Sequence, residues 1–194
     1  MRDSQASRVV KSCFPEVLEE VVRRSAAQCF KDSGVAFAPV AAPAALRLGD
    51  AHVAGLMGFT GQIDGQLMVV STFEVIATMR LSGVDPTALS KSRAGDWILI
   101  RDCVGEFANQ FVGRMKNRLR GFDIRFNVGT PTALSGPALL ASASRYKDGR
   151  TFAFGRGKDL VHVVIKVAKE PSLVSPESKV VGPDLPREGD LLLL

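Results

Sequence analysis

The residues with the clearest chemical potential in this chain are a carboxylate and an amide, Glu106 and Asn109, in the segment GEFANQFVG. Residues three positions apart on a helix are neighbours on its surface, so the two side chains are expected to lie side by side. The amide has both donor and acceptor atoms. Gly113, in the next turn, has no side chain to shield the pair. The pattern predicts a polar spot that a second molecule can approach closely.

The helix that would position this pair is predicted for residues 101–121. Each helical residue advances by about 100°, which puts the apolar side chains on one broad face and Asp102, Glu106 and Asn109 nearly opposite. Helix propensity does not favour this polar stripe, because an interior glycine such as Gly113 costs about 1 kcal/mol relative to alanine. Acids and amides also belong on any solvated helix face, so the pair alone does not establish a site. The predicted apolar face comprises Trp97, Ile100, Val104, Phe107, Phe111 and Met115.

Outside this helix the apolar pattern changes to the alternation that is typical of strands with one buried face. The dipeptide Asp64-Gly65 lies between two apolar runs and predicts a tight hairpin turn, and the segment GRGKD at 155–159 predicts another. Further helices are predicted at 14–30 and at about 72–83. The alternating apolar residues are Ile124, Phe126 and Val128, then Phe152 and Phe154, then Val161, Val163, Ile165 and Val167.

These elements together predict an α/β (α+β) fold with a mixed, largely antiparallel sheet. The helices at 14–30 and 101–121 are expected to pack on one face of it, with the acid and the amide turned to solvent. Residues 1–169 are expected to form one domain. The segment 170–194 is rich in proline and has no periodicity, which predicts a flexible tail.

The composition narrows the class of protein. The 194 residues are 46% hydrophobic, enough for one core. The net charge is +5, but the bases alternate with acids and there is one Trp and one Tyr, so nucleic acid is not an expected partner.

With no signal-peptide pattern and no long apolar run, we expect a cytoplasmic protein that does not insert into membranes. Cys13, Cys29 and Cys103 lack disulfide or metal spacing, and His52 and His162 lack ligand-spaced neighbours, so no metal site is expected.

The spacing Asp102-x3-Glu106-x2-Asn109-x21-Pro131 resembles the signature of the CheC/CheX family of chemotaxis phosphatases, which remove phosphate from the aspartyl phosphate of CheY-type response regulators. The surrounding GEFANQFVGRMKNRL is similar to the family's run G-E-x-x-N-x-x-x-G-x-x-K-x-x-L. The likeness extends more loosely from the N-terminal helix to the last strand. CheC-type members carry a second E-x-x-N pair, whereas the comparable stretch here, 74–77, reads EVIA. The resemblance therefore implies a CheX-like protein with one site per chain.

The resemblance also implies the roles of the two central residues. Asn109 would orient the water that attacks the phosphorus atom, and Glu106 would pair with a lysine of the receiver domain. The receiver would bring its own Mg²⁺, so no cofactor is expected to bind this chain.

The remaining residues of the stripe are expected to contact the partner. Asp102 would sit at the rim as a helper, and Gly113 would allow close approach, although a helix-packing reason for this glycine is equally open. Lys116 and Arg120 would attract an acidic receiver, or they are ordinary solvated charges. Pro131 is expected to fix the entry to a strand.

Three assignments remain open at this stage. The first is a phosphatase that forms a homodimer through its sheet, as family members of the CheX kind do. The second is a non-catalytic CheX-like domain that docks a receiver or another signalling protein. The third is a basic nucleic-acid binder, whose affinity would fall steeply with added salt.

Overall fold

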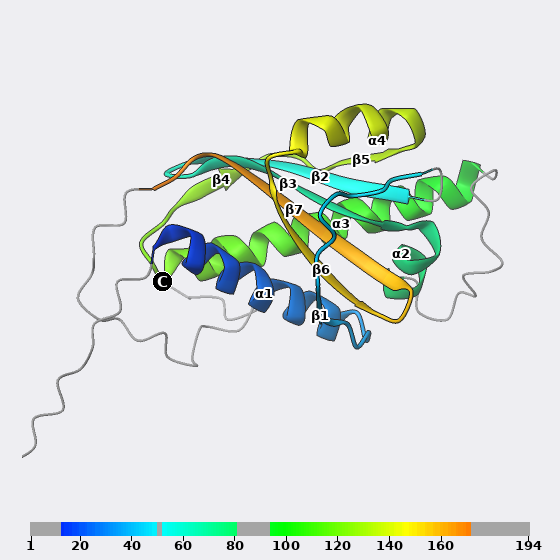
Figure 1. Cartoon of the computed structure of the whole chain (residues 1–194), viewed down its shortest axis with the longest axis horizontal. Helices are drawn as coiled ribbons and strands as arrows, with labels where there is room; N and C mark the ends of the chain where they lie inside the picture. The colour runs from blue at the N-terminus through cyan, green and yellow to red at the C-terminus, as the bar shows by residue number, and fades with distance from the viewer. Residues whose placement is uncertain (1–12, 50–51, 81–93, 172–194) are drawn as a thin grey trace, which may run out of the picture.

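Seven strands form one sheet in the computed structural model, which describes residues 13–49, 52–80 and 94–171 (Figure 1). The strand order is β1-β6-β7-β3-β2-β4, and β5 also pairs with β2. Every pairing among the described strands is antiparallel, so the largely antiparallel sheet is confirmed and no parallel pair occurs in this part of the chain. The strands are β1 (Ala38–Val40), β2 (His52–Gly61), β3 (Asp64–Thr72), β4 (Phe126–Val128), β5 (Thr132–Ser135), β6 (Arg150–Arg156) and β7 (Asp159–Lys169).

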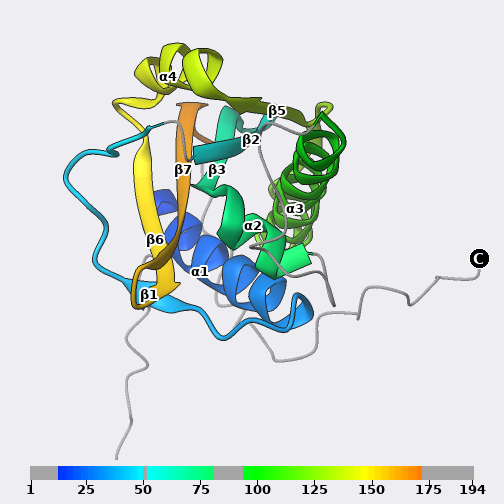
Figure 2. The ribbon, with the colours of Figure 1, turned by 90° about the vertical axis from the view of Figure 1, so that its right-hand side faces the viewer.

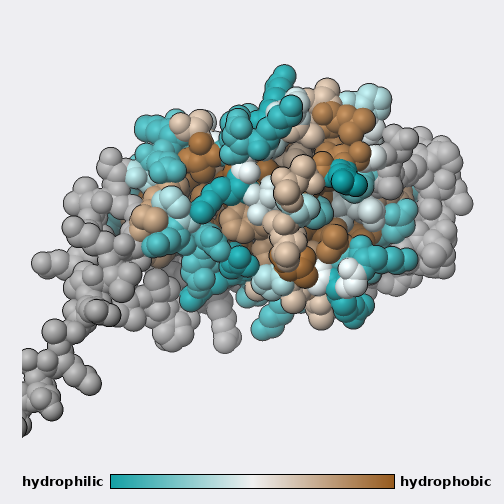
Figure 3. All heavy atoms as spheres, in the orientation of Figure 1, coloured by the Kyte–Doolittle hydropathy of each residue, from teal (hydrophilic) through white to brown (hydrophobic). Residues whose placement is uncertain are grey.

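Helices α1 (Phe14–Asp32) and α3 (Ala94–Arg120) lie on the same face of this sheet, as predicted, and α2 (Phe73–Arg80) packs into the same core (Figures 1 and 2). Helix α3 begins at Ala94, seven residues before the predicted start at residue 101. Helix α4 (Gly136–Ala143) and the short 3-10 helix η2 (Ser144–Tyr146) cover part of the opposite face, and these two elements were not predicted. In Figure 3 hydrophobic atoms reach the surface over α4, where Leu140 is 46% exposed.

The apolar face of α3 is buried as the helical periodicity predicts. Five of its six predicted residues have no exposed surface, and Trp97 is partly buried against the same core. Aromatic rings connect the two long helices to the sheet. The ring centroid of Phe30 on α1 lies 5.7 Å from that of Phe107 on α3 and 5.5 Å from that of Phe154 on β6. The five fully buried residues are Ile100, Val104, Phe107, Phe111 and Met115.

A glycine on β2 allows α3 to lie against the sheet. A Cβ atom added to Gly55 would lie 2.5 Å from the carbonyl oxygen of Val104 and 3.0 Å from Cβ of Ala108. Both atoms belong to α3, and backbone cannot move aside as a flexible side chain can. The separation between helix and sheet at this point therefore depends on the absence of a side chain.

The two predicted hairpins are present. Strands β6 and β7 are joined through Gly157, whose φ is +64°. Strand β2 ends at Gly61 and β3 begins at Asp64, so Asp64-Gly65 starts the second strand instead of forming the turn, and the Asp64 carboxylate accepts a hydrogen bond from the Gly61 amide at 2.7 Å. At the start of α2 the Val75 amide donates to Thr72 Oγ1 at 3.4 Å, so the Thr72 side chain caps the helix.

Some expectations lie outside the described residues. They are the end of the short helix at residue 83 and the flexible tail beyond residue 171. The assignment of residues 1–169 to one domain stays a prediction. No helix in the described part of the chain is long and apolar enough to cross a membrane.

We expect Gly55→Ala to lower the free energy of unfolding by about 1–3 kcal/mol, because the added methyl group would collide with the backbone of α3. Gly58→Ala is the matched control, since Gly58 is on the same strand and an added Cβ meets no atom of the described residues within 4 Å. Urea unfolding of both variants checks this. Equal stability of the two variants would contradict the close approach of helix and strand.

The stability of the protein is expected to fall as the pH drops below about 6.5. Burial, together with the nearby charge of His52, lowers the pKa of His162 on β7. A folded-state pKa below the unfolded one means that the unfolded chain takes up a proton first, so stability is lost as the pH falls. Urea unfolding between pH 7.5 and 5.5 should show a shallower loss for His162→Val than for the wild type. An identical pH slope in the variant would show that His162 does not cause the loss of stability at low pH.

Candidate functional site

The predicted polar stripe lies on the exposed side of α3. Asp102, Glu106 and Asn109 are all exposed, and Gly113 is partly exposed. The side of α3 opposite the stripe faces the sheet, and α3 also packs against α1. The structure thus brings the acid and the amide to the surface together.

An open hollow of about 530 Å³ adjoins the acid end of this stripe. Asp102 and Glu106 line one side, and Pro131 lines the other. Asn109 is one turn further along α3 and is not among the lining residues. Three of the four positions of the sequence pattern therefore meet at one place, although Pro131 is distant in the chain. The complete lining is Arg101, Asp102, Gly105, Glu106, Pro131, Thr132 and Ala133.

Strand pairing explains why Pro131 reaches the helix. Pro131 directly precedes β5, as expected for a residue that fixes the entry to a strand, and β5 pairs with β2. Because α3 lies over β2, the start of β5 comes against the side of α3. A Cβ atom on Gly105 would lie 3.9 Å from Cβ of Pro131, which is an ordinary contact distance.

The polar groups of the stripe differ in how they are held. Glu106 Oε1 accepts a hydrogen bond of 2.8 Å from Gln110 Nε2. Asp102 Oδ1 lies 3.9 Å from Nε of its neighbour Arg101. This ion pair is exposed and contributes little to stability. The Asn109 amide makes no hydrogen bond within the described residues, so both its donor and its acceptor are available to a partner.

Basic residues continue beyond the stripe toward the end of α3. Lys116 is partly exposed and Arg120 exposed, and neither lines the hollow. Arg118 turns toward α1, where its Nη2 donates to the carbonyl of Arg24 at 3.4 Å. Burial, with the nearby charges of Arg24 and Arg114, lowers the pKa of Arg118. This end of the helix is therefore a cationic surface.

No group of three or more His, Cys, Asp or Glu side chains in the described part of the chain could hold a metal ion. The two acids at the hollow, Asp102 and Glu106, stand without a third acid, cysteine or histidine among its lining residues. The expectation that this chain binds no metal or cofactor of its own stays a prediction.

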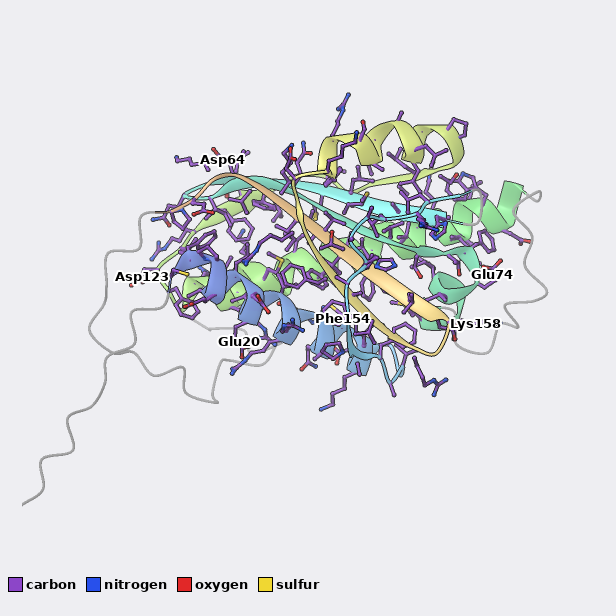
Figure 4. All side chains as sticks on the ribbon, in the orientation of Figure 1. Glu20, Asp64, Glu74, Asp123, Phe154 and Lys158 are labelled. Atoms are coloured by element: carbon purple, nitrogen blue, oxygen red, sulfur yellow. The ribbon has the colours of Figure 1, made fainter. Side chains whose placement is uncertain are left out.

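The sequence as a whole allows one acid–amide pair of this kind. The chain contains three asparagines, Asn109, Asn117 and Asn127, and Asn109 alone has an acid three residues before it. On α2, Glu74 is exposed near the turn that contains Lys158 (Figure 4), but Ala77, three residues later, is 1% exposed and faces the core. The chain therefore contains one E-x-x-N pair, and the expectation of one site per chain stays a prediction.

The model of the family described as chemotaxis phosphatase CheX matches residues 53–154, just over half of the chain. The chain belongs to the CheX family. The match contains all but the first residue of β2, all of β3 and α3, and most of β6, and so includes the whole polar stripe and Pro131. No curated protein sequence matches the chain.

Solved structures agree with the CheX fold. A CheC-like superfamily protein from Shewanella sp. PV-4 has a TM-score of 0.59 at 21% identity, covering 78% of this chain and 97% of its own. A chemotaxis protein CheX from Vibrio vulnificus has a TM-score of 0.56 at 19% identity, covering 76% and 99%. The CheX of a CheX–CheY–BeF3–Mg complex from Borrelia burgdorferi has a TM-score of 0.59 at 14% identity, covering 79% and 98%.

Sequence reasoning missed several residues at this candidate site. Arg101, Thr132 and Ala133 line the hollow but have no motif that marks them. Gln110 contacts Glu106, and here a signal was present, because residues four apart on a helix are neighbours.

Packing among the described residues does not explain Gly113, because an added Cβ would meet none of their atoms within 4 Å. We therefore expect Gly113→Ala to raise the free energy of unfolding by up to about 1 kcal/mol, the helix-propensity difference between the two residues. Urea unfolding measures this. A lower stability of the variant would show that the fold itself needs the glycine.

Proposed function

We propose that this CheX-family protein hydrolyses the aspartyl phosphate of a CheY-type receiver domain. The observation that carries the proposal is the exposed pair of Glu106 and Asn109, one turn apart on α3, beside the hollow that Pro131 lines. The Borrelia burgdorferi CheX, which shares this fold, was crystallised with CheY, BeF3 and Mg. A receiver domain of the CheY type is therefore the partner that we assign to the polar stripe.

The reaction requires little from the phosphatase beyond placing water. The water oxygen bonds to phosphorus while the bond between phosphorus and the aspartate oxygen breaks, which yields inorganic phosphate and a free carboxylate. Catalysis of such a step depends mainly on alignment and on charge stabilisation. In our proposal the receiver contributes its Mg²⁺ and its lysine, and this chain contributes the aligned water.

Asn109 is the residue that we assign to the water. Its amide can donate and accept at once, so it can hold a water molecule in one orientation without exchanging a proton. The amide is exposed and has no hydrogen-bond partner in the described part of the chain, so no internal bond must break first.

Glu106 is assigned to anchoring the receiver. Its carboxylate lies at the edge of the hollow, where it can pair with the lysine of a docked receiver and fix the register of α3 in the receiver's active site. Asp102 stands at the rim of the same hollow and helps to orient the partner, while Gly113 lets the partner's backbone come close.

Lys116 and Arg120 extend the contact in our proposal. Their charges lie on the same helix, beyond the acid–amide pair, and would attract an acidic receiver. Such charges raise the association rate more than the affinity, and their effect weakens with added salt. The expected homodimer stays a prediction.

The two central residues are expected to fail in different ways. Asn109→Ala should lower kcat for phosphate release by about 100-fold or more, as loss of a group that acts in the transition state does, while leaving KM near the wild-type value. Glu106→Lys should raise KM by at least about tenfold, because it places a cation against the receiver's lysine. Steady-state assays with a phosphorylated receiver measure both effects.

Asn117→Ala is the matched control, since Asn117 is an exposed amide two turns further along the same helix. It should keep wild-type kcat and KM. A loss in Asn117→Ala equal to that in Asn109→Ala would remove the site assignment. Stable binding of phosphorylated receiver without any acceleration would instead establish a non-catalytic docking domain.

A further inference from the structure

The Glu106 carboxylate is held by one of its two oxygens. Gln110 Nε2 lies 2.8 Å from Glu106 Oε1, one turn further along α3. A carboxylate can only accept hydrogen bonds, so the nitrogen of the Gln110 amide must be the atom that faces it. Within the described part of the chain, Glu106 Oε2 accepts no hydrogen bond. One oxygen is therefore held, and the other can still accept a hydrogen bond.

The turn that carries Gln110 is itself fastened to α1. Arg114 Nη1 donates to the backbone carbonyl of Gln110 at 3.2 Å, and Arg114 Nη2 donates to Asp32 Oδ2 at the end of α1 at 2.5 Å. Arg114 is 8% exposed, so this ion pair is largely shielded from solvent. Gln110 is also partly buried. Both the backbone carbonyl and the side-chain amide of Gln110 are therefore engaged in hydrogen bonds.

We propose that Gln110 is a positioning residue for receiver recognition, a role that rests on the proposed phosphatase function. Its amide holds the Glu106 carboxylate in the orientation that meets the receiver's cation. A glutamate side chain that is ordered before binding loses less entropy on binding, so the effect falls on affinity. The family run around the pair leaves this position unspecified, which makes Gln110 an addition to the recognised pattern.

Gln110→Met is the direct test, because methionine has a similar length and no donor. We expect KM for the phosphorylated receiver to rise about two- to tenfold, the range for loss of one hydrogen bond, with kcat within about twofold of the wild type. A structural defect would instead lower the active fraction, and so the apparent kcat, at constant KM. Thermal unfolding of the variant checks that it is folded.

Gln28→Met is the matched control. Gln28 Nε2 donates to Asp32 Oδ1 at 2.7 Å, a bond of the same kind between residues four apart, on α1. This variant should keep the wild-type KM and kcat. If it raises KM as much as Gln110→Met does, the effect belongs to the contact between α1 and α3, and the assigned role of Gln110 is wrong.

A double-mutant cycle separates the role of Gln110 from any direct contact with the receiver. In the Glu106→Ala background, Gln110→Met should change kcat/KM by less than about twofold, because its target is already gone. Full additivity of the two losses, or a wild-type KM in Gln110→Met, would overturn the inference.

Failure of the proposed function gives a different result. A wild-type protein that accelerates phosphate loss from no receiver removes the phosphatase. The same cycle is then measured on binding of a CheY-type receiver loaded with beryllofluoride and Mg²⁺. Non-additive losses there support the role of Gln110, and additive losses or an absence of binding overturn it.

Discussion

The fold depends on the close contact between α3 and β2 at Gly55. A side chain at this position would overlap the backbone of Val104, so the helix can lie at its observed depth only over a glycine. With one face of α3 committed to the sheet, the helical repeat leaves Glu106 and Asn109 no direction except outward. The same strand β2 pairs with β5, which places Pro131 beside the helix. Strand β2 therefore positions both the core and the site.

Much of this arrangement could be predicted from local sequence patterns. The 100° repeat of α3 separates Phe107 from Glu106 without reference to any other part of the chain, and the alternation of Val161, Val163 and Ile165 marks the inward face of β7. These signals are strong because burial on one side of an element imposes its period on the sequence. The exposure of the acid and the amide followed from the same rule.

The parts that could not be predicted depend on pairing between distant segments. The hollow exists because β5 joins the edge of β2, a long-range pairing that no period in residues 132–135 reveals. Helix α4 has eight residues, too few for a clear apolar stripe, and its single fully buried residue is Leu139. Strand β3 is buried on both faces through Leu67–Ser71, so it shows no alternation. Gln110 was missed although its spacing from Glu106 was visible.

The most direct test of the central claim is a single-turnover measurement on the CheY-type receivers of the same cell, labelled with phosphate at their aspartate. The decay of the label is followed with saturating wild-type protein, with saturating Asn109→Ala, and with the receiver alone. Our account predicts that the wild type accelerates the decay for at least one receiver and that Asn109→Ala, although bound, leaves it at the rate of the receiver alone. Decay with saturating Asn109→Ala as fast as with the wild type would contradict the account.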